Sequence, residues 1–151
     1  MVKPVPEGYH TVTPYIIVDG GAKALDFYAR AFGATERLRI PGAGGKIGHA
    51  EITIGDSYIM LADEHPEVGA LSPTTVGGSP VTLHVYVADV DAVVAKAVAA
   101  GAKLTRPVAD QFYGDRVGGV TDPFGHRWSI ATHKEDLSTE ELQRRAAAQG
   151  H

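Results

Sequence analysis

The chain has 151 residues, a usual size for one globular domain, and 44% of them are hydrophobic, which is too many for a disordered chain. Its 14 basic and 18 acidic residues give a net charge of -4 with no basic stripe, so nucleic acid is not an expected partner. The absence of cysteine excludes disulfides, thiolate metal sites and a cysteine nucleophile.

The sequence also carries no sign of a membrane segment. The first residues contain no apolar signal region, and no apolar run approaches the roughly 20 residues that a membrane span requires. We therefore expect a cytoplasmic protein without membrane contacts. The 18 glycines and 9 prolines indicate many turns between short strands.

The first predicted elements are a strand and a helix. Residues 12–18 are rich in β-forming residues and predict a strand, and the alanine-rich stretch from Gly21 to Phe32 predicts a helix. Asp19 stands where this helix would take its N-cap, and Gly33 where it would take a left-handed C-cap. Alternation of apolar and polar residues then predicts two strands, over 48–54 and 58–62.

The same order of elements returns about 69 residues later. Residues 81–87 predict a strand, and Val90 to Ala100 predicts a helix with Asp89 as its N-cap and Gly101 as its C-cap. A turn followed by an alternating strand, over 124–131, matches the end of the first copy. The sequence is therefore interpreted as two tandem βαβββ units within one compact domain.

These repeats set the expected boundaries. The first βαβββ module covers residues 9–64 and the second covers 81–134, with a linker rich in Pro, Gly, Ser and Thr over 65–80. Ser138 to Glu141 forms a capping-box pattern, which predicts a short C-terminal helix over 138–148.

The strand pattern also predicts which side chains face away from the helices. A helix covers the apolar side of its sheet, so the residues that alternate with the apolar ones form a helix-free face. This face carries Thr13, Tyr15, Ile17, His49, Glu51, Thr53, Tyr58, Met60, Thr82, His84, Tyr86, Arg127 and Ser129. Aromatic, hydroxyl and few ionisable groups are typical of a face that binds a ligand. The alternatives are a solvated face or a face buried in a dimer.

Several motifs indicate a family. They are Thr13–Val18, Ala24–Tyr28, Ala31–Ala34, His49–Ile52, His84–Val87, Gln111–Arg116 and Asp122–Trp128. With these motifs the sequence resembles the vicinal oxygen chelate superfamily in its glyoxalase/bleomycin-resistance/dioxygenase branch, and more narrowly the PhnB-like proteins. The resemblance implies an α+β fold in which tandem βαβββ modules form a curved eight-stranded mixed sheet, with helices on its convex side, and it implies a homodimer. It also implies chemistry that ranges from metal-dependent isomerases, lyases and dioxygenases to metal-free drug-binding proteins.

The family's metal positions can be carried over to this sequence. Metal-dependent relatives place one His or Glu ligand on the first and last strand of each half, and these positions correspond to Thr13, Met60, Thr82 and Ser129. None of them is an imidazole or a carboxylate, so we expect the standard metal to be absent. A shift of the alignment by two residues would replace Thr82 by His84.

Three side chains on the helix-free face leave other chemistry open. His49, Glu51 and His84 would suffice for a divalent metal at a non-standard site, if they converge. Glu51 could also act as a general base beside an imidazole. The preferred interpretation is that His84 and Glu51 hydrogen-bond a ligand or each other.

The loop over 111–116 is a second candidate region. Phe112 and Tyr113 could cap an apolar ligand, and Arg116 could bind a carboxylate or phosphonate. The alternative is that an ion pair between Asp115 and a neighbouring arginine makes the loop rigid.

The sequence thus favours a protein that binds a small, partly polar organic molecule without cofactor or metal. The candidate ligand-binding residues are Tyr15, His49, Glu51, Tyr58, His84, Tyr86, Tyr113, Arg116 and Arg127. The alternative is a lyase, isomerase or dioxygenase that uses a non-standard metal site or Glu51 as base, for which Glu51, His49 and His84 are the catalytic candidates. A third hypothesis is an interaction protein whose cleft is closed by a partner.

Overall fold

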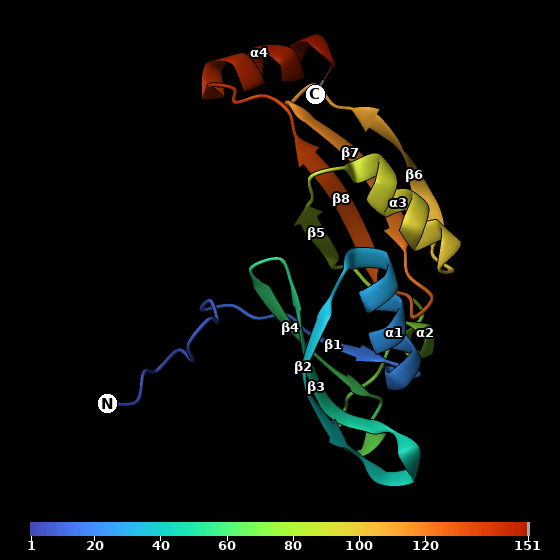
Figure 1. Ribbon diagram of the computed structural model, residues 1–151. Helices are drawn as coiled ribbons and strands as arrows, with labels where there is room; N and C mark the ends of the chain where they lie inside the picture. The colour runs from blue at the N-terminus through green and yellow to red at the C-terminus, as the bar shows by residue number, and fades with distance from the viewer. Residues whose placement is uncertain (151) are drawn as a thin grey trace. The chain divides into compact units, whose positions relative to one another are not determined.

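Figure 1 shows the chain as a computed structural model, which describes residues 1–150. Its eight strands form two four-stranded mixed sheets, one from each predicted repeat, which confirms the α+β class and the tandem βαβββ order. The first repeat comprises β1 (Tyr15–Val18), α1 (Gly21–Phe32), β2 (Thr35–Pro41), β3 (Ile47–Ile54) and β4 (Ser57–Asp63). The second comprises β5 (Thr82–Tyr86), α3 (Val90–Ala99), β6 (Lys103–Asp110), β7 (Asp115–Thr121) and β8 (Arg127–His133).

The two sheets have the same topology. Their strand orders are β1-β4-β3-β2 and β5-β8-β7-β6, and only the first pair of each sheet is parallel. Tyr15 pairs with Met60 in one sheet and His84 with Ser129 in the other, which preserves the ~69-residue spacing of the repeat. β1 begins at Tyr15, later than expected, because Pro14 has no N–H to donate; its carbonyl still accepts a hydrogen bond from Met60 over 2.9 Å.

The chain divides into two compact units. Unit 1 comprises Met1–Pro80 together with the turn Pro123–His126, and unit 2 comprises Val81–Asp122 and the residues from Arg127 onward. The turn falls inside residues 81–134, which the sequence assigns to the second module. It belongs to unit 1 by its contacts.

The turn supplies one aromatic ring to the core of unit 1. Phe124 is only 6% exposed, and its ring centroid lies 6.2 Å from those of both Phe27 and Tyr28 on α1. His126 Nε2 donates a hydrogen bond to the carbonyl of Ile17 over 2.7 Å. The core of unit 1 is therefore completed by a segment far along the sequence.

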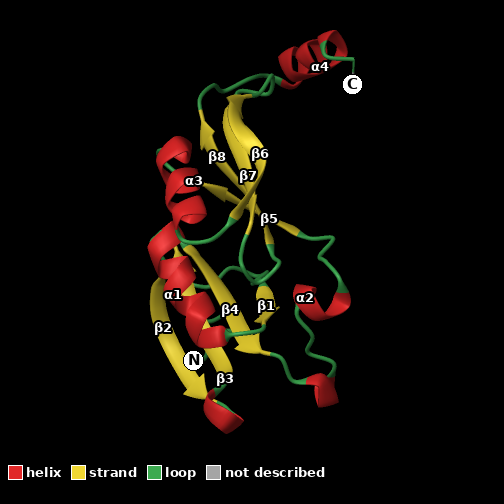
Figure 2. Cartoon of the chain, turned by 90° about the vertical axis from the view of Figure 1, so that its right-hand side faces the viewer, coloured by secondary structure: helices red, strands yellow, loops and turns green. Residues whose placement is uncertain are grey.

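Each sheet is covered on one face by a helix. Figure 2 shows α1 crossing the first sheet and α3 lying against β6, β7 and β8. Buried positions on α1 recur at helical spacing, as a core-facing stripe requires: Ala24, Leu25, Phe27, Tyr28 and Ala31. Val90, Val94 and Ala97 form the equivalent stripe on α3. No helix within residues 1–150 combines the length and the apolar character needed to cross a membrane.

Most predicted helix ends are confirmed. Gly33 adopts the left-handed conformation (φ 68°) after α1, Asp89 accepts a hydrogen bond from Ala92 N, and Ser138 caps α4 (Thr139–Ala148) by accepting from Glu141 N. The predicted C-cap at Gly101 is wrong by one residue, since Ala100 is the C-cap of α3 and Gly101 (φ 119°) follows it. The predicted N-cap at Asp19 is also wrong. Gly20 holds that position with φ 114°, and Asp63 at the end of β4 supplies the acceptor.

Candidate functional site

A chain of hydrogen bonds crosses the helix-free face of the first sheet. The Tyr15 hydroxyl lies 2.8 Å from His49 Nδ1, and His49 Nε2 lies 2.8 Å from Glu51 Oε2. His49 and Glu51 alternate on β3 and therefore share a face, and Met60 on β4 pairs with both Tyr15 and Glu51. The strand pattern predicted that these three polar residues face the same side of the sheet, and the structure further shows that hydrogen bonds link them through His49.

The carboxylate at the end of this chain is largely shielded from solvent. The side chains of His49 and Glu51 are 24% and 17% exposed. Partial burial of the Tyr15 ring raises the pKa of its hydroxyl, which therefore stays protonated at neutral pH. These hydrogen bonds link a hydroxyl, an imidazole and a carboxylate in that order. Such a set of groups can orient a ligand or transfer a proton.

Tyr9 adds a further contact that the sequence pattern did not predict. Its ring stacks on Tyr58, with centroids 3.9 Å apart and planes 19° apart, and its hydroxyl donates to Glu51 Oε1. Both oxygens of Glu51 therefore have partners. Tyr9 precedes β1 in a segment without regular structure, so neither helical nor strand periodicity could have identified it.

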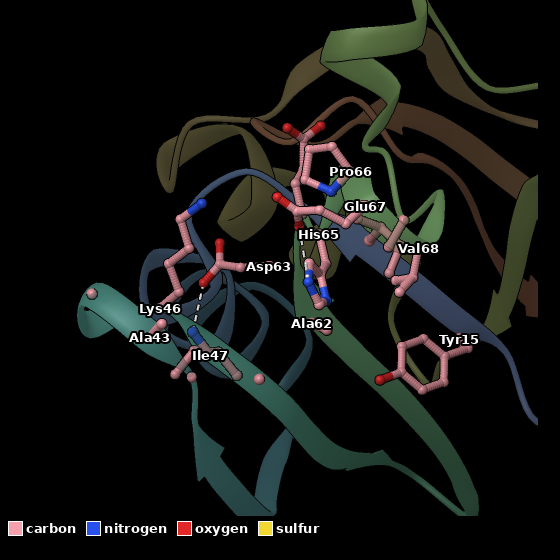
Figure 3. Close-up of a pocket in the computed structure, with 16 residues that line it drawn as sticks. Tyr15, Ala43, Lys46, Ile47, Ala62, Asp63, His65, Pro66, Glu67 and Val68 are labelled. Carbon is pink, nitrogen blue, oxygen red and sulfur yellow. Dashed lines mark hydrogen bonds and ion pairs between the residues drawn. The ribbon is translucent and has the colours of Figure 1, made fainter.

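A pocket of about 710 Å³ lies in unit 1, where β1 and β4 end and β3 begins. Figure 3 shows Tyr15 on one side of it, Lys46 and Asp63 on another, and residues 65–68 above. Its apolar lining includes Ile17, Ala62 and Val68. Tyr15 belongs both to the pocket and to the hydrogen-bonded chain, so the two features adjoin.

Two short segments complete the pocket wall. The turn η1 (Ala43–Gly45) lies between β2 and β3, and η2 (Pro66–Val68) follows β4. η2 falls in the stretch predicted as the linker, and both segments are rich in Gly or Pro, a composition that indicates loops without indicating what the loops enclose.

Glu64 fixes the segment that follows η2. Its Oε2 accepts hydrogen bonds from the Ser72 hydroxyl over 2.6 Å and the Ser72 N–H over 2.7 Å, and also from the Thr75 hydroxyl. These bonds, that of the Ser72 hydroxyl above all, lower the pKa of Glu64 to about 2. Glu64 is therefore ionised at neutral pH and ties the short helix α2 (Pro73–Val76) to the end of β4.

The equivalent face of unit 2 carries the remaining candidates from the strand pattern. His84 Nδ1 lies 2.9 Å from the Ser129 hydroxyl, and the Tyr86 ring meets His84 edge-on at 4.8 Å. Burial, with help from the nearby Asp115 carboxylate, raises the pKa of Tyr86. Arg127 is exposed on β8 beside Thr82.

The loop candidates are held by contacts within unit 2. Arg116 donates to Asp91 over 2.8 and 3.1 Å and to Asp110 over 3.2 Å, so its partners differ from the expected Asp115. These two carboxylates raise the pKa of Arg116 further. Tyr113 packs edge-on against Phe112 at 5.2 Å. Arg116 thus serves here as a link between β6, β7 and α3.

Asp115 has a different partner, His133 on β8. His133 Nδ1 lies 2.7 Å from Asp115, which is 6% exposed, and His133 Nε2 lies 2.8 Å from Asp136. The two carboxylates, Asp136 first, raise the pKa of His133. No motif signals this pair, because the contact depends on the register of β7 and β8.

The strand register shows which side chains lie at and beside the family's metal positions. The residues directly across from Met60 and Ser129 are Tyr15 and His84, since Thr13 precedes β1 and Thr82 pairs with Arg127. A thioether, two hydroxyls and one imidazole are a poor match for a divalent metal site. Among residues 1–150, no group of three or more His, Asp or Glu side chains is arranged to hold a metal ion.

Comparisons with known proteins agree with this architecture. An uncharacterized protein from Mycobacterium bovis is 42% identical over 142 residues, which are 92% of this chain and 93% of that protein. The X-ray structure of an Arabidopsis thaliana gene product is 30% identical, with a TM-score of 0.67 over 82% of this chain and 98% of that one. The crystal structure of TioX from Micromonospora sp. ML1 is 26% identical, with a TM-score of 0.64 over 85% and 100%.

A family model matches residues 9–130, which include the first βαβββ repeat, the turn Pro123–His126 and the second repeat as far as the middle of β8. That model describes the Glyoxalase/Bleomycin resistance protein/Dioxygenase superfamily. The chain belongs to this superfamily.

Proposed function

We propose that this protein binds a small, partly polar organic molecule in the pocket of unit 1, without the metal ion that many members of its superfamily use. The observation that carries the proposal is the position of Tyr15. One side chain both lines a pocket of about 710 Å³ and joins the His49–Glu51 chain. Pockets for small organic ligands have about this volume, and they combine apolar walls with a few polar groups.

The lining supports a ligand with an apolar body and polar ends. Ile17, Ala62 and Val68 provide apolar surface, while Lys46 and the Tyr15 hydroxyl provide polar contacts at opposite sides. Burial of the ligand's apolar atoms would supply most of the binding free energy, and the polar groups would select its orientation.

Isothermal titration calorimetry tests the proposal against a panel of aromatic and heteroaromatic compounds, before and after treatment with a chelator. Val68 is exposed at the pocket, so Val68→Trp should obstruct it without disturbing the core. We expect Val68→Trp to weaken binding at least tenfold and chelation to leave it unchanged. Val76→Trp, on an exposed α2 residue outside the lining, is the matched control. Binding that survives Val68→Trp, or that disappears with the metal, would contradict the proposal.

The hydrogen-bonded order Tyr15–His49–Glu51 favours a second candidate function. Glu51 could serve as a general base whose proton leaves through His49, in lyase, isomerase or dioxygenase-type chemistry. Glu51→Gln should then abolish turnover of a panel compound while its binding persists. Elemental analysis of the purified protein distinguishes a metal-assisted version, since a stoichiometric divalent metal would favour it.

Assembly, location and subgroup complete the proposal. We place the protein in the cytoplasm, as a homodimer of the PhnB-like subgroup. Every residue of the edge strand β2 is exposed, including Leu38 and Ile40, which supports association through apolar surface. Sedimentation equilibrium that gives the mass of one chain would contradict the dimer.

A further inference from the structure

Tyr9, in the N-terminal segment, covers part of the helix-free face of unit 1. We propose that Tyr58 and Glu51 form a subsite for an aromatic hydroxyl group of the ligand, and that Tyr9 fills this subsite until the ligand displaces it. The inference rests on the proposed binding function and names the ligand class, namely compounds that carry a phenol.

The contacts of Tyr9 are those that a bound phenol would make. Its ring lies flat on Tyr58, with centroids 3.9 Å apart, and its hydroxyl donates to Glu51. Any aromatic ring could stack on Tyr58, whereas the hydrogen bond to a carboxylate requires the hydroxyl group and so distinguishes a phenol from a plain aromatic ring. Glu51 is positioned for this role because His49 holds its other oxygen.

Little else holds the segment that carries Tyr9. Residues 1–8 are exposed, and their polar contacts are local: Lys3 with Glu7 at 2.5 Å, and Tyr9 N–H with the carbonyl of Pro6 at 3.1 Å. Gly8 permits the close approach, since its φ is +84° and a Cβ there would lie 3.3 Å from the Tyr58 ring. Release of Tyr9 therefore breaks mainly its stacking on Tyr58 and its hydrogen bond to Glu51, both of which the incoming phenol replaces.

The subsite adjoins the pocket through side chains already described. Glu51 contacts His49, His49 contacts Tyr15, and Tyr15 lines the pocket. A ligand with its body in the pocket and a hydroxyl-bearing ring at Tyr58 would contact both regions.

The experiment measures the affinity of 2-naphthol and of 2-methoxynaphthalene, which lacks the hydroxyl donor, by ligand fluorescence. We expect Tyr9→Ala to bind 2-naphthol at least fivefold more tightly than the wild type, with no such gain for 2-methoxynaphthalene. Tyr9→Phe keeps the ring and removes only the hydroxyl, so it should give a smaller gain in affinity for 2-naphthol. This conservative variant also provides a test if the alanine variant misfolds. Glu51→Gln in the Tyr9→Ala background should remove the gain, and His10→Ala, at an exposed neighbour, should match the wild type.

Displacement has a direct readout in the wild type. Saturation with 2-naphthol should move the amide signals of Gly8 and Tyr9 in NMR spectra toward the positions they take in Tyr58→Ala, where the stacking surface is missing. Equal affinity of wild type and Tyr9→Ala for 2-naphthol, or an equal gain for both probes, would overturn the subsite. The pocket proposal is judged separately by the Val68→Trp comparison, so it can stand while the subsite fails.

Discussion

The carboxylate of Asp63 accepts a hydrogen bond from the backbone N–H of Gly21 over 2.8 Å, although 42 residues separate the two. The same oxygen accepts from Gly20 N–H over 2.9 Å, and the other accepts from Ile47 N–H over 2.7 Å. One side chain at the end of β4 therefore fixes the start of α1 and the start of β3. Because Asp63 and Ile47 also line the pocket, this contact shapes the candidate site.

Removal of that carboxylate should destabilise the protein. Asp63→Ala leaves three backbone N–H groups without their acceptor, and we expect a loss of about 2–4 kcal/mol in the free energy of unfolding. Urea unfolding followed by circular dichroism measures it. Asp56→Ala, at an exposed turn, should change the midpoint little. An unchanged midpoint for Asp63→Ala would show that water replaces the carboxylate at no cost.

The low pKa of Glu64 predicts how stability responds to acid. Its pKa is about 2 in the folded protein and near 4.5 when unfolded, so its hydrogen bonds stabilise the fold above about pH 4.5 and lose that effect as the pH falls toward 2. The melting temperature of Glu64→Gln should therefore fall less than that of the wild type as the pH is lowered over this range. Melting temperatures of both proteins at pH 2–6 test this, with Glu140→Gln on α4 as the control for loss of a carboxylate. If melting temperature changes with pH in the same way for wild type and Glu64→Gln, the low pKa of Glu64 is refuted.

The pair of His133 with Asp115 predicts the opposite pH response. The pKa of His133 is raised in the folded state, so the imidazolium stabilises the fold fully below about pH 6.5, and this contribution is lost as the pH rises through the folded pKa. The gap in melting temperature between wild type and His133→Gln should narrow with rising pH. His10→Gln, at an exposed position, provides the comparison. If the difference in melting temperature between the two proteins widens above neutral pH, the neutral imidazole of His133 makes the stabilising contact.

Phe124 should contribute as much to the stability of unit 1 as a buried residue of α1. The ring is buried against Phe27 and Tyr28, and Phe124→Ala should cost about 3–5 kcal/mol through lost burial and the cavity left behind. Urea denaturation measures the loss, with the exposed neighbour Pro123→Ala as a control. A cost below about 1 kcal/mol would show that α1 closes over the gap.

The sequence predicted the features that depend on local periodicity. Alternation placed Tyr15, His49 and Glu51 on one face, and the alanine-rich stretches predicted as helices form α1 and α3. Contacts that depend on tertiary approach were missed. Asp63 rather than Asp19 caps α1, Tyr9 reaches the sheet from an irregular segment, and the pocket wall comes from loops.

Turn Pro123–His126 makes unit 1 discontinuous in sequence. A fragment that ends at Pro80 would keep every strand of the first sheet and still lack Phe124 and the His126 bond to Ile17. Its core would expose aromatic surface from Phe27 and Tyr28. If the two repeats arose by duplication, the present halves are no longer interchangeable copies, because the second carries a part that the first requires. Recombination or design that exchanges single modules must therefore transfer this turn together with residues 1–80.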